Sequence, residues 1–136
     1  MKIGIDLINL KLNNLGGGLG RFALQLVDGL VAIDNKNEYV LFINAELENK
    51  IRINNPKFHL RIVKTPHRRY APWNQIYFLL HKKELCGIDL LHSPVTPSPL
   101  LLFGSTKTLV SIHDLAWEFF PNTFRRLGVF WWSIAW

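Results

Sequence analysis

The chain has 136 residues, 49% hydrophobic and 19% charged, and this balance excludes a disordered or low-complexity protein. Its length is that of one domain, so residues 1–136 are taken as a single domain. Sixteen Lys and Arg against ten Asp and Glu give a net charge of +6, which favours anionic partners. No basic run exceeds two residues and no nucleic-acid-binding motif is found, so no nucleic acid is expected as a partner.

The cysteine content and the N-terminus bear on where the protein resides. Cys86 is the single cysteine and has no partner for an internal disulfide, which favours a reducing compartment; we interpret it as a buried core residue. Asp6 and Asn9 interrupt the apolar region that a signal peptide needs. The late apolar run 127–136 is about half a membrane span. A cytoplasmic protein is expected, either free or peripheral at the inner face of the membrane.

The first half of the chain predicts three strands and one helix. Apolar residues from Phe22 to Ile33 recur at helical spacing, and the turn signal 34–37 follows them. The segment FHLRIVK alternates apolar and polar residues, which is typical of a more exposed strand near a sheet edge. The expected elements are a buried strand over 2–10, a helix over 20–33, an apolar strand over 38–44 and this edge strand over 58–64.

The second half predicts a helix over 73–85 that Gly87 stops, and strands over 88–92 and 106–113. Alternating helices and apolar strands indicate an α/β fold with a doubly wound, mostly parallel, Rossmann-like sheet. The segment Phe124–Trp136 (FRRLGVFWWSIAW) looks like the start of a helix with a large apolar surface. Such a surface would have to be covered by a missing remainder of the chain, by a dimer partner or by a membrane.

The glycine-rich segment GGGLGR, residues 16–21, lies between the first predicted strand and the first predicted helix. It fails the dinucleotide fingerprint G-x-G-x-x-G, because Arg21 occupies the last position, and it fails the Walker A pattern as well. Glycines nevertheless let the backbone approach a ligand, and a helix N-terminus with a neighbouring arginine favours an anion. We therefore keep two interpretations of this segment: an anion-binding site and a bare turn.

Two histidines, His92 and His113, fall at the predicted carboxyl ends of strands, where open α/β sheets bind ligands. His113 is the stronger candidate because the polar Asp114 follows it. Ser111 and His113 share a face of an extended chain while Asp114 points away, so no local Ser-His-Asp catalytic unit is expected. The histidine and cysteine spacings match no zinc motif, and no metal is expected.

The ordered set of these segments resembles the N-terminal domain of the family 4 glycosyltransferases, retaining enzymes of the GT-B fold. The segments, in chain order, are MKIGIDLINL, GGGLGR, DLLHSPVTPSP and TLVSIHDLAWEFFPNTF. The resemblance covers nearly the whole chain, and its most specific part is His113–Phe124. It implies the N-terminal half of a GT-B fold, which holds the acceptor and faces a second, nucleotide-sugar-binding domain.

The resemblance also implies roles for individual residues. Gly17 and Gly18 would bring backbone N–H groups near the donor diphosphate or the acceptor, and Arg21 would assist the phosphates or the acceptor. His113 would face the transferred sugar as the catalytic residue. The implied reaction moves a hexosyl group from a nucleotide-sugar donor to a sugar or lipid-linked acceptor with retention of configuration, and it needs neither a cofactor nor a metal.

The chain lacks the family's second domain. The family's second domain carries a basic pair for the diphosphate and two glutamates for the nucleotide and sugar, and neither can be assigned before Trp136. We therefore expect a truncated or split domain that is inactive alone. The alternative hypothesis is a non-catalytic interaction module, whose basic surface and C-terminal aromatic segment serve homo-oligomer formation or membrane-surface binding.

Overall fold

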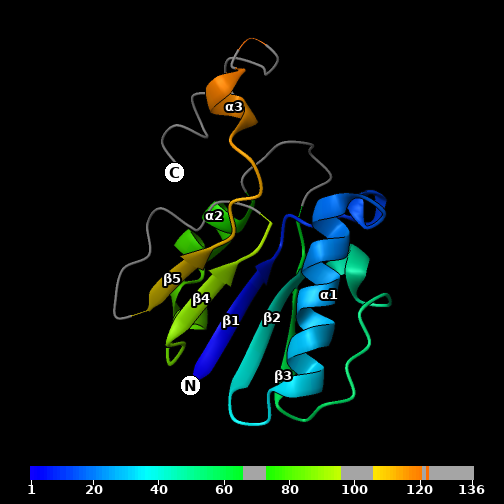
Figure 1. Ribbon diagram of the computed structural model, residues 1–136. Helices are drawn as coiled ribbons and strands as arrows, with labels where there is room; N and C mark the ends of the chain where they lie inside the picture. The colour runs from blue at the N-terminus through cyan, green and yellow to red at the C-terminus, as the bar shows by residue number, and fades with distance from the viewer. Residues whose placement is uncertain (66–72, 96–105, 121, 123–136) are drawn as a thin grey trace.

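A computed structural model describes residues 1–65, 73–95, 106–120 and 122 (Figure 1). Its five strands form one parallel sheet in the order β3-β2-β1-β4-β5, which confirms the predicted α/β class. The strands are β1 (Lys2–Leu7), β2 (Glu38–Asn44), β3 (Phe58–Val63), β4 (Leu90–Ser93) and β5 (Lys107–Val110). Because β4 returns to lie beside β1, the direction of strand addition reverses between these two strands.

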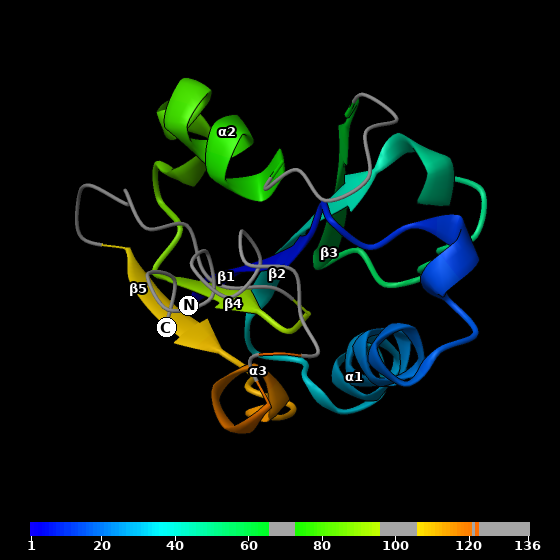
Figure 2. The ribbon, with the colours of Figure 1, turned by 90° about the horizontal axis from the view of Figure 1, so that it is seen from above.

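Two helices cover opposite faces of the sheet, as the view from above shows (Figure 2). These are α1 (Gly18–Ile33) and α2 (Trp73–Leu80), and a single turn, α3 (Ala116–Phe119), follows β5. Short 3₁₀ turns complete the structure at η1 (Leu12–Asn14), η2 (Ala45–Leu47) and η3 (Lys82–Leu85). Among the residues that the structure describes, none of the helices combines the length and apolar character that crossing a bilayer requires.

The core consists of two clusters, one on each face of the sheet. Ile5 and Leu7 are fully buried with Val27 of α1 in the first cluster. On the other face, Phe42 of β2 packs against Phe78 of α2 in the second cluster. Burial of each such side chain stabilises the fold by roughly 1.5–3 kcal/mol. The two clusters hold the sheet between α1 and α2 and thereby fix the positions of the loops at its edges.

The turn between α1 and β2 is organised by the carboxylate of Asp34. It accepts hydrogen bonds from the backbone N–H groups of Lys36 and Asn37, from the Asn37 side chain, and from the Tyr39 hydroxyl at 2.6 Å. These donors, Tyr39 first among them, hold the pKa of Asp34 well below its usual range. Burial, together with the hydrogen bond to Asp34, raises the pKa of Tyr39 to about 12. The turn thus sets where β2 begins.

Several expectations about single elements differ from the structure. The helix predicted over 73–85 ends at Leu80, and residues Lys82–Leu85 form a 3₁₀ turn instead. The strand predicted over 106–113 ends at Val110, since its partner β4 ends at Ser93. The interpretation of Cys86 as a buried residue was wrong, because it is exposed. The C-terminal segment Phe124–Trp136 lies outside the described residues.

Candidate functional site

The candidate site lies at the carboxyl edge of the sheet, where β1 and β4 are neighbours. In open parallel sheets ligands bind outside the carboxyl ends of the strands, at the point where the strand order reverses. Here that point is the β1–β4 boundary. The segment from Leu7 to α1 leaves this edge from β1, and the segment that carries His113 leaves it from β5. The topology therefore brings the two sequence-predicted segments to one edge.

The glycine-rich segment forms the beginning of α1. Gly17 is the N-cap with an extended backbone (φ −80°, ψ 169°), and its carbonyl accepts a hydrogen bond from the Arg21 N–H at 3.0 Å. The Gly17 N–H itself donates to the Asn14 carbonyl, 3.1 Å away. The first N–H groups of a helix have no intrahelical partner, so from Gly18 onward they can receive an anion. A side chain at Gly16 or Gly18 would meet nothing within 4 Å, which leaves this end of α1 open.

Of the glycines in this segment, Gly20 is the one whose position has no room for a side chain. A Cβ atom there would lie 2.3 Å from the Asn14 carbonyl oxygen and 2.7 Å from the Leu15 Cα atom. Both are backbone atoms, so no side-chain rotation could relieve the clash. The first turn of α1 therefore lies directly against the chain that leads into it. No local sequence signal marks Gly20, because its requirement comes from a tertiary contact.

His113 contacts both α1 and the residue that follows β4. Its Nε2 atom lies 2.7 Å from the Pro94 carbonyl oxygen, and its ring packs edge-to-face against Phe22 of α1, with centroids 4.7 Å apart. A carbonyl only accepts, so Nε2 carries the proton and Nδ1 is the acceptor atom of the neutral ring. His113 lies three residues beyond β5 and is exposed. It can thus offer Nδ1 to a hydroxyl group of a ligand.

His92 and Ser111 form a second polar pair at this edge. The His92 Nε2 atom and the Ser111 Oγ atom are 3.0 Å apart, and burial lowers the pKa of His92. Asp114 instead accepts a hydrogen bond from the Ala116 N–H at the start of α3. Ser111, His113 and Asp114 thus bond to three different partners: His92, the Pro94 carbonyl and the Ala116 N–H. Arg21 is exposed, and its guanidinium makes no ion pair with the residues that the structure describes.

A buried carboxylate, Asp6, underlies this edge and was not identified from the sequence. It is 1% exposed and accepts hydrogen bonds from the Asn74 side chain at 2.8 Å and the Ile8 N–H at 3.1 Å. Ser93 Oγ is a longer contact at 3.5 Å, and Asn9 donates in turn to Asn74. Burial, offset in part by these hydrogen bonds, raises the pKa of Asp6 to about 6. Asp6 thus links β1, α2 and β4 beneath the site.

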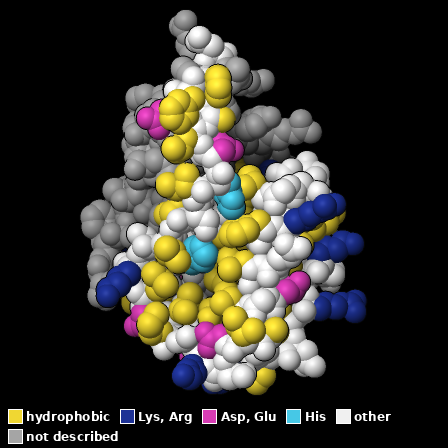
Figure 3. Space-filling model, viewed as in Figure 1, with side chains coloured by type: hydrophobic (Ala, Val, Ile, Leu, Met, Phe, Trp, Pro, Cys, Tyr) yellow, Lys and Arg dark blue, Asp and Glu magenta, His cyan; other side chains and the backbone are white. Residues whose placement is uncertain are grey.

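The surface around the site is mainly apolar. On the face that carries α1, histidine side chains lie among hydrophobic side chains, and the basic side chains lie toward the periphery of the view (Figure 3). In the described part of the chain, no group of three or more histidine, cysteine or acidic side chains could hold a metal ion. Comparisons of the chain with protein-family models, curated proteins and solved structures found no match.

Proposed function

We propose that this chain is the acceptor-side domain of a retaining glycosyltransferase that uses a nucleotide-sugar donor. The sheet would be the doubly wound, Rossmann-like half of a GT-B fold, and a second domain would supply most of the nucleotide site. One observation carries the proposal: the open N-terminus of α1 and the His113 ring lie at the same edge of the sheet, joined through Phe22. That edge is also where the strand order reverses.

The chemistry of the proposed reaction suits these groups. Departure of a nucleoside diphosphate builds negative charge on its phosphate oxygens and positive charge on the sugar. Fixed N–H donors stabilise the first charge, and the Gly18 N–H and the positive end of α1 are such donors. The Nδ1 atom of His113 would accept a hydrogen bond from a hydroxyl of the transferred sugar and orient it. Gly17, the N-cap, and Gly18 would bring backbone N–H groups near the phosphates, and Arg21 would add a positive charge nearby.

The remaining parts of the proposal concern partners and location. The donor is a nucleotide-sugar and the acceptor a sugar or a lipid-linked sugar. Nothing in this arrangement requires a protein nucleophile, because in the proposed retaining reaction the acceptor hydroxyl attacks from the leaving group's face. We place the reaction in a reducing compartment, the cytoplasm, because the chain's single cysteine, Cys86, has no partner in the chain for a disulfide.

The proposal is tested by titrating the ¹⁵N-labelled chain with two kinds of probe and following its amide NMR signals. Uridine, guanosine and adenosine diphosphates probe the helix N-terminus, and simple methyl glycosides probe the sugar site. We expect a diphosphate to shift the Gly18 amide and a glycoside to shift the signals around His113. Shifts confined to the opposite edge of the sheet, or no shift with any probe, would contradict the proposal.

Replacing His113 by alanine should weaken binding of the responsive glycoside about fivefold, the loss expected for one hydrogen bond of about 1 kcal/mol. The diphosphate response of Gly18 should remain, since the helix N-terminus is unchanged. His59→Ala is the matched control, because His59 is an exposed histidine on β3. Equal affinity of His113→Ala and the parent chain for the glycoside would remove His113 from the site.

A second candidate function, self-association as an interaction module, is favoured by exposed apolar side chains from β5 to α3. Leu109 is 48% exposed, Ile112 56%, Phe119 70% and Phe120 64%. Contiguous apolar surface of this kind marks interaction sites. We expect Phe119→Ser with Phe120→Ser to lower the association constant of any dimer at least tenfold in sedimentation equilibrium. A chain that is monomeric at all concentrations, or a dimer that the double substitution leaves intact, would exclude this surface.

A further inference from the structure

A hollow of about 270 Å³ lies on the sheet face that carries α2, away from the site described above. Lys2 of β1, Val40 of β2 and His59 and Arg61 of β3 line one side of it. In a parallel sheet this face is usually covered, but α2 has only eight residues and leaves the amino-terminal half of these strands open. The other side is the segment from Lys83 to Ile88, which follows α2.

The lining combines converging positive charges with an apolar floor. Lys2, Arg61 and Lys83 come from three different elements, and His59 adds a further N–H donor. Val40 and Ile88 contribute the apolar part. The side chains of Lys2, His59 and Lys83 make no hydrogen bond or ion pair with the residues that the structure describes. The ammonium groups of Lys2 and Lys83 are therefore available to a ligand, and so is the His59 ring as a hydrogen-bond donor.

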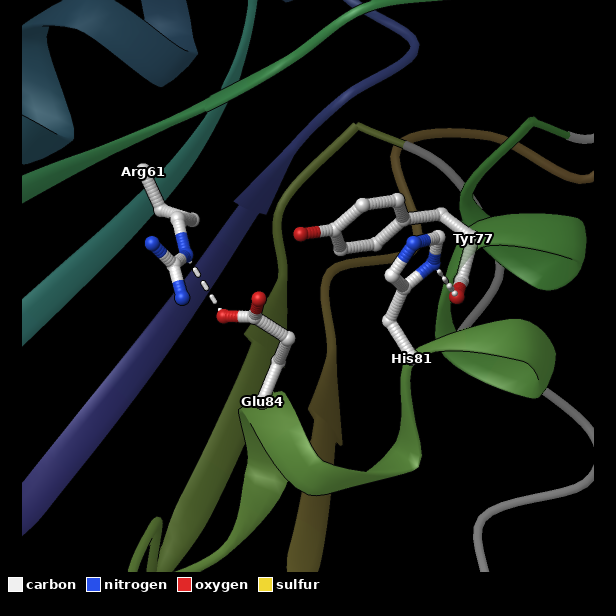
Figure 4. A network of polar contacts seen from close by, with 4 residues as sticks. All are labelled: Arg61, Tyr77, His81 and Glu84. Carbon is white, nitrogen blue, oxygen red and sulfur yellow. Dashed lines mark hydrogen bonds and ion pairs between the residues drawn. The ribbon is translucent and has the colours of Figure 1, made fainter.

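The one acidic side chain of the lining is already paired. Arg61 Nε and Glu84 Oε2 are 2.5 Å apart, and Figure 4 shows the two side chains facing each other across the gap between β3 and η3. This bond uses one of the five donors of the guanidinium, and Tyr77 is a second neighbour that interacts with Arg61, so the other donors remain for a ligand. Tyr77 lies beside the pair and stacks on His81, with ring centroids 4.5 Å apart. Glu84 thus fixes Arg61 while the net charge of the lining stays positive.

From this arrangement we infer a second ligand site, one that binds a phosphate monoester through Lys2, Arg61 and Lys83. Its volume is below the roughly 300 Å³ of typical small-molecule pockets, so the occupant is a small organic phosphate rather than a dinucleotide. The apolar floor accommodates the organic part. A larger hollow of about 460 Å³ beside Asp34 is a weaker candidate, because that carboxylate is already saturated with donors. The inference does not depend on the function proposed above.

Cys86 provides a direct test, because it lines the hollow, is exposed, and is the only cysteine of the chain. The rate of its alkylation by the neutral reagent iodoacetamide is measured with and without glycerol 3-phosphate as the probe. We expect bound probe to slow alkylation roughly tenfold at ten times its dissociation constant, when about one molecule in eleven is unoccupied. Sodium chloride at the same ionic strength should leave the rate unchanged.

Substitutions of the lining lysines test whether their charges cause the protection. Lys83→Ala should weaken the protection about two- to fivefold, as expected for one exposed charge, and Lys2→Ala should do the same. Lys107→Ala is the matched control, since Lys107 is an exposed lysine on β5 outside the lining. Unchanged protection in both Lys83→Ala and Lys2→Ala would overturn the site. Because the parent chain alone shows whether protection occurs, the test does not depend on the variants folding.

A phosphate monoester can be free or part of a lipid headgroup, and a second arm separates the two sources. Vesicles of phosphatidylcholine with phosphatidic acid replace the soluble probe, and vesicles of phosphatidylcholine alone are the control. Protection by glycerol 3-phosphate supports the site with a free ligand, and protection by phosphatidic acid vesicles alone supports it with a lipid headgroup. Absence of protection in both arms, or equal protection by sodium chloride, would overturn the inference.

Discussion

Replacing Gly20 by alanine is expected to lower the free energy of unfolding by about 2 kcal/mol, within the range for overpacking a closely packed position. The added methyl group would lie 2.3 Å from the Asn14 carbonyl oxygen and 2.9 Å from that of Leu15. The backbone before α1 would have to move away from the helix. This cost exceeds the roughly 1 kcal/mol that alanine gains over glycine inside a helix. Urea unfolding followed by circular dichroism measures the change.

The same helix contains the control, Gly29. An alanine there would meet nothing within 4 Å, so Gly29→Ala should raise the free energy of unfolding by about 0.5–1 kcal/mol. The two substitutions add the same atoms to the same helix and are expected to act in opposite directions. If Gly20→Ala were as stable as Gly29→Ala, the close approach at the start of α1 would be refuted.

The second large effect concerns pH: the free energy of unfolding is expected to contain a contribution from Asp6 that falls as pH rises from about 4 to about 6. The folded chain raises the pKa of this carboxyl from 3.8 to about 6, so the folded state holds the proton more tightly than the unfolded state. The stabilising contribution is complete below the unfolded-state pKa of 3.8, and it is lost once the pH exceeds the folded-state pKa of about 6. Its size is about 3 kcal/mol, from 1.36 kcal/mol for each pKa unit.

Asp6→Asn isolates this contribution, because it keeps the shape of the side chain and removes its titration. Asp34 acts with the opposite sign, since its lowered pKa makes the folded state lose stability as pH falls. Asp34 is present in both chains, so its contribution cancels in the difference between them. The difference in unfolding free energy, measured by urea titration at several pH values, should change between pH 4 and 6 and be constant above. A constant difference across that range would show that Asp6 is not a buried titrating group.

Much of the fold could be predicted from the sequence, because local pattern and tertiary packing agree. The strand Glu38–Asn44 has the predicted bounds, since an apolar run lies between the turn at Asp34 and a residue that caps the next turn. The edge position of β3 followed from its exposed, alternating residues. The helix after β3 was predicted too long, because the backbone at His81 leaves the helical conformation although the apolar spacing continues to Leu85.

The candidate site was predictable only in part, because its contacts join residues far apart in the chain. His113 and the glycine-rich segment were found from their places relative to strands, which is a local signal. The bond between Asn74 and Asp6 spans 68 residues, and no local pattern indicates it. A usable signal was nevertheless present: Asp6 is an acidic residue between Ile5 and Leu7 in a strand expected to be buried. Such a side chain must find donors when it is buried.

The strand order has a consequence for how the chain acquires its structure during synthesis. β1 precedes both of its partners in the chain: it pairs with β2, where Lys2 lies opposite Glu38, and its other edge pairs with β4, where Ile3 lies opposite Leu90. Until residues near Leu90 have left the ribosome, that edge of β1 offers unpaired N–H and carbonyl groups to any passing strand. Pairings between distant segments also form slowly. The central strand β1 is therefore synthesised before both of its partners and is enclosed only after β4 has been made.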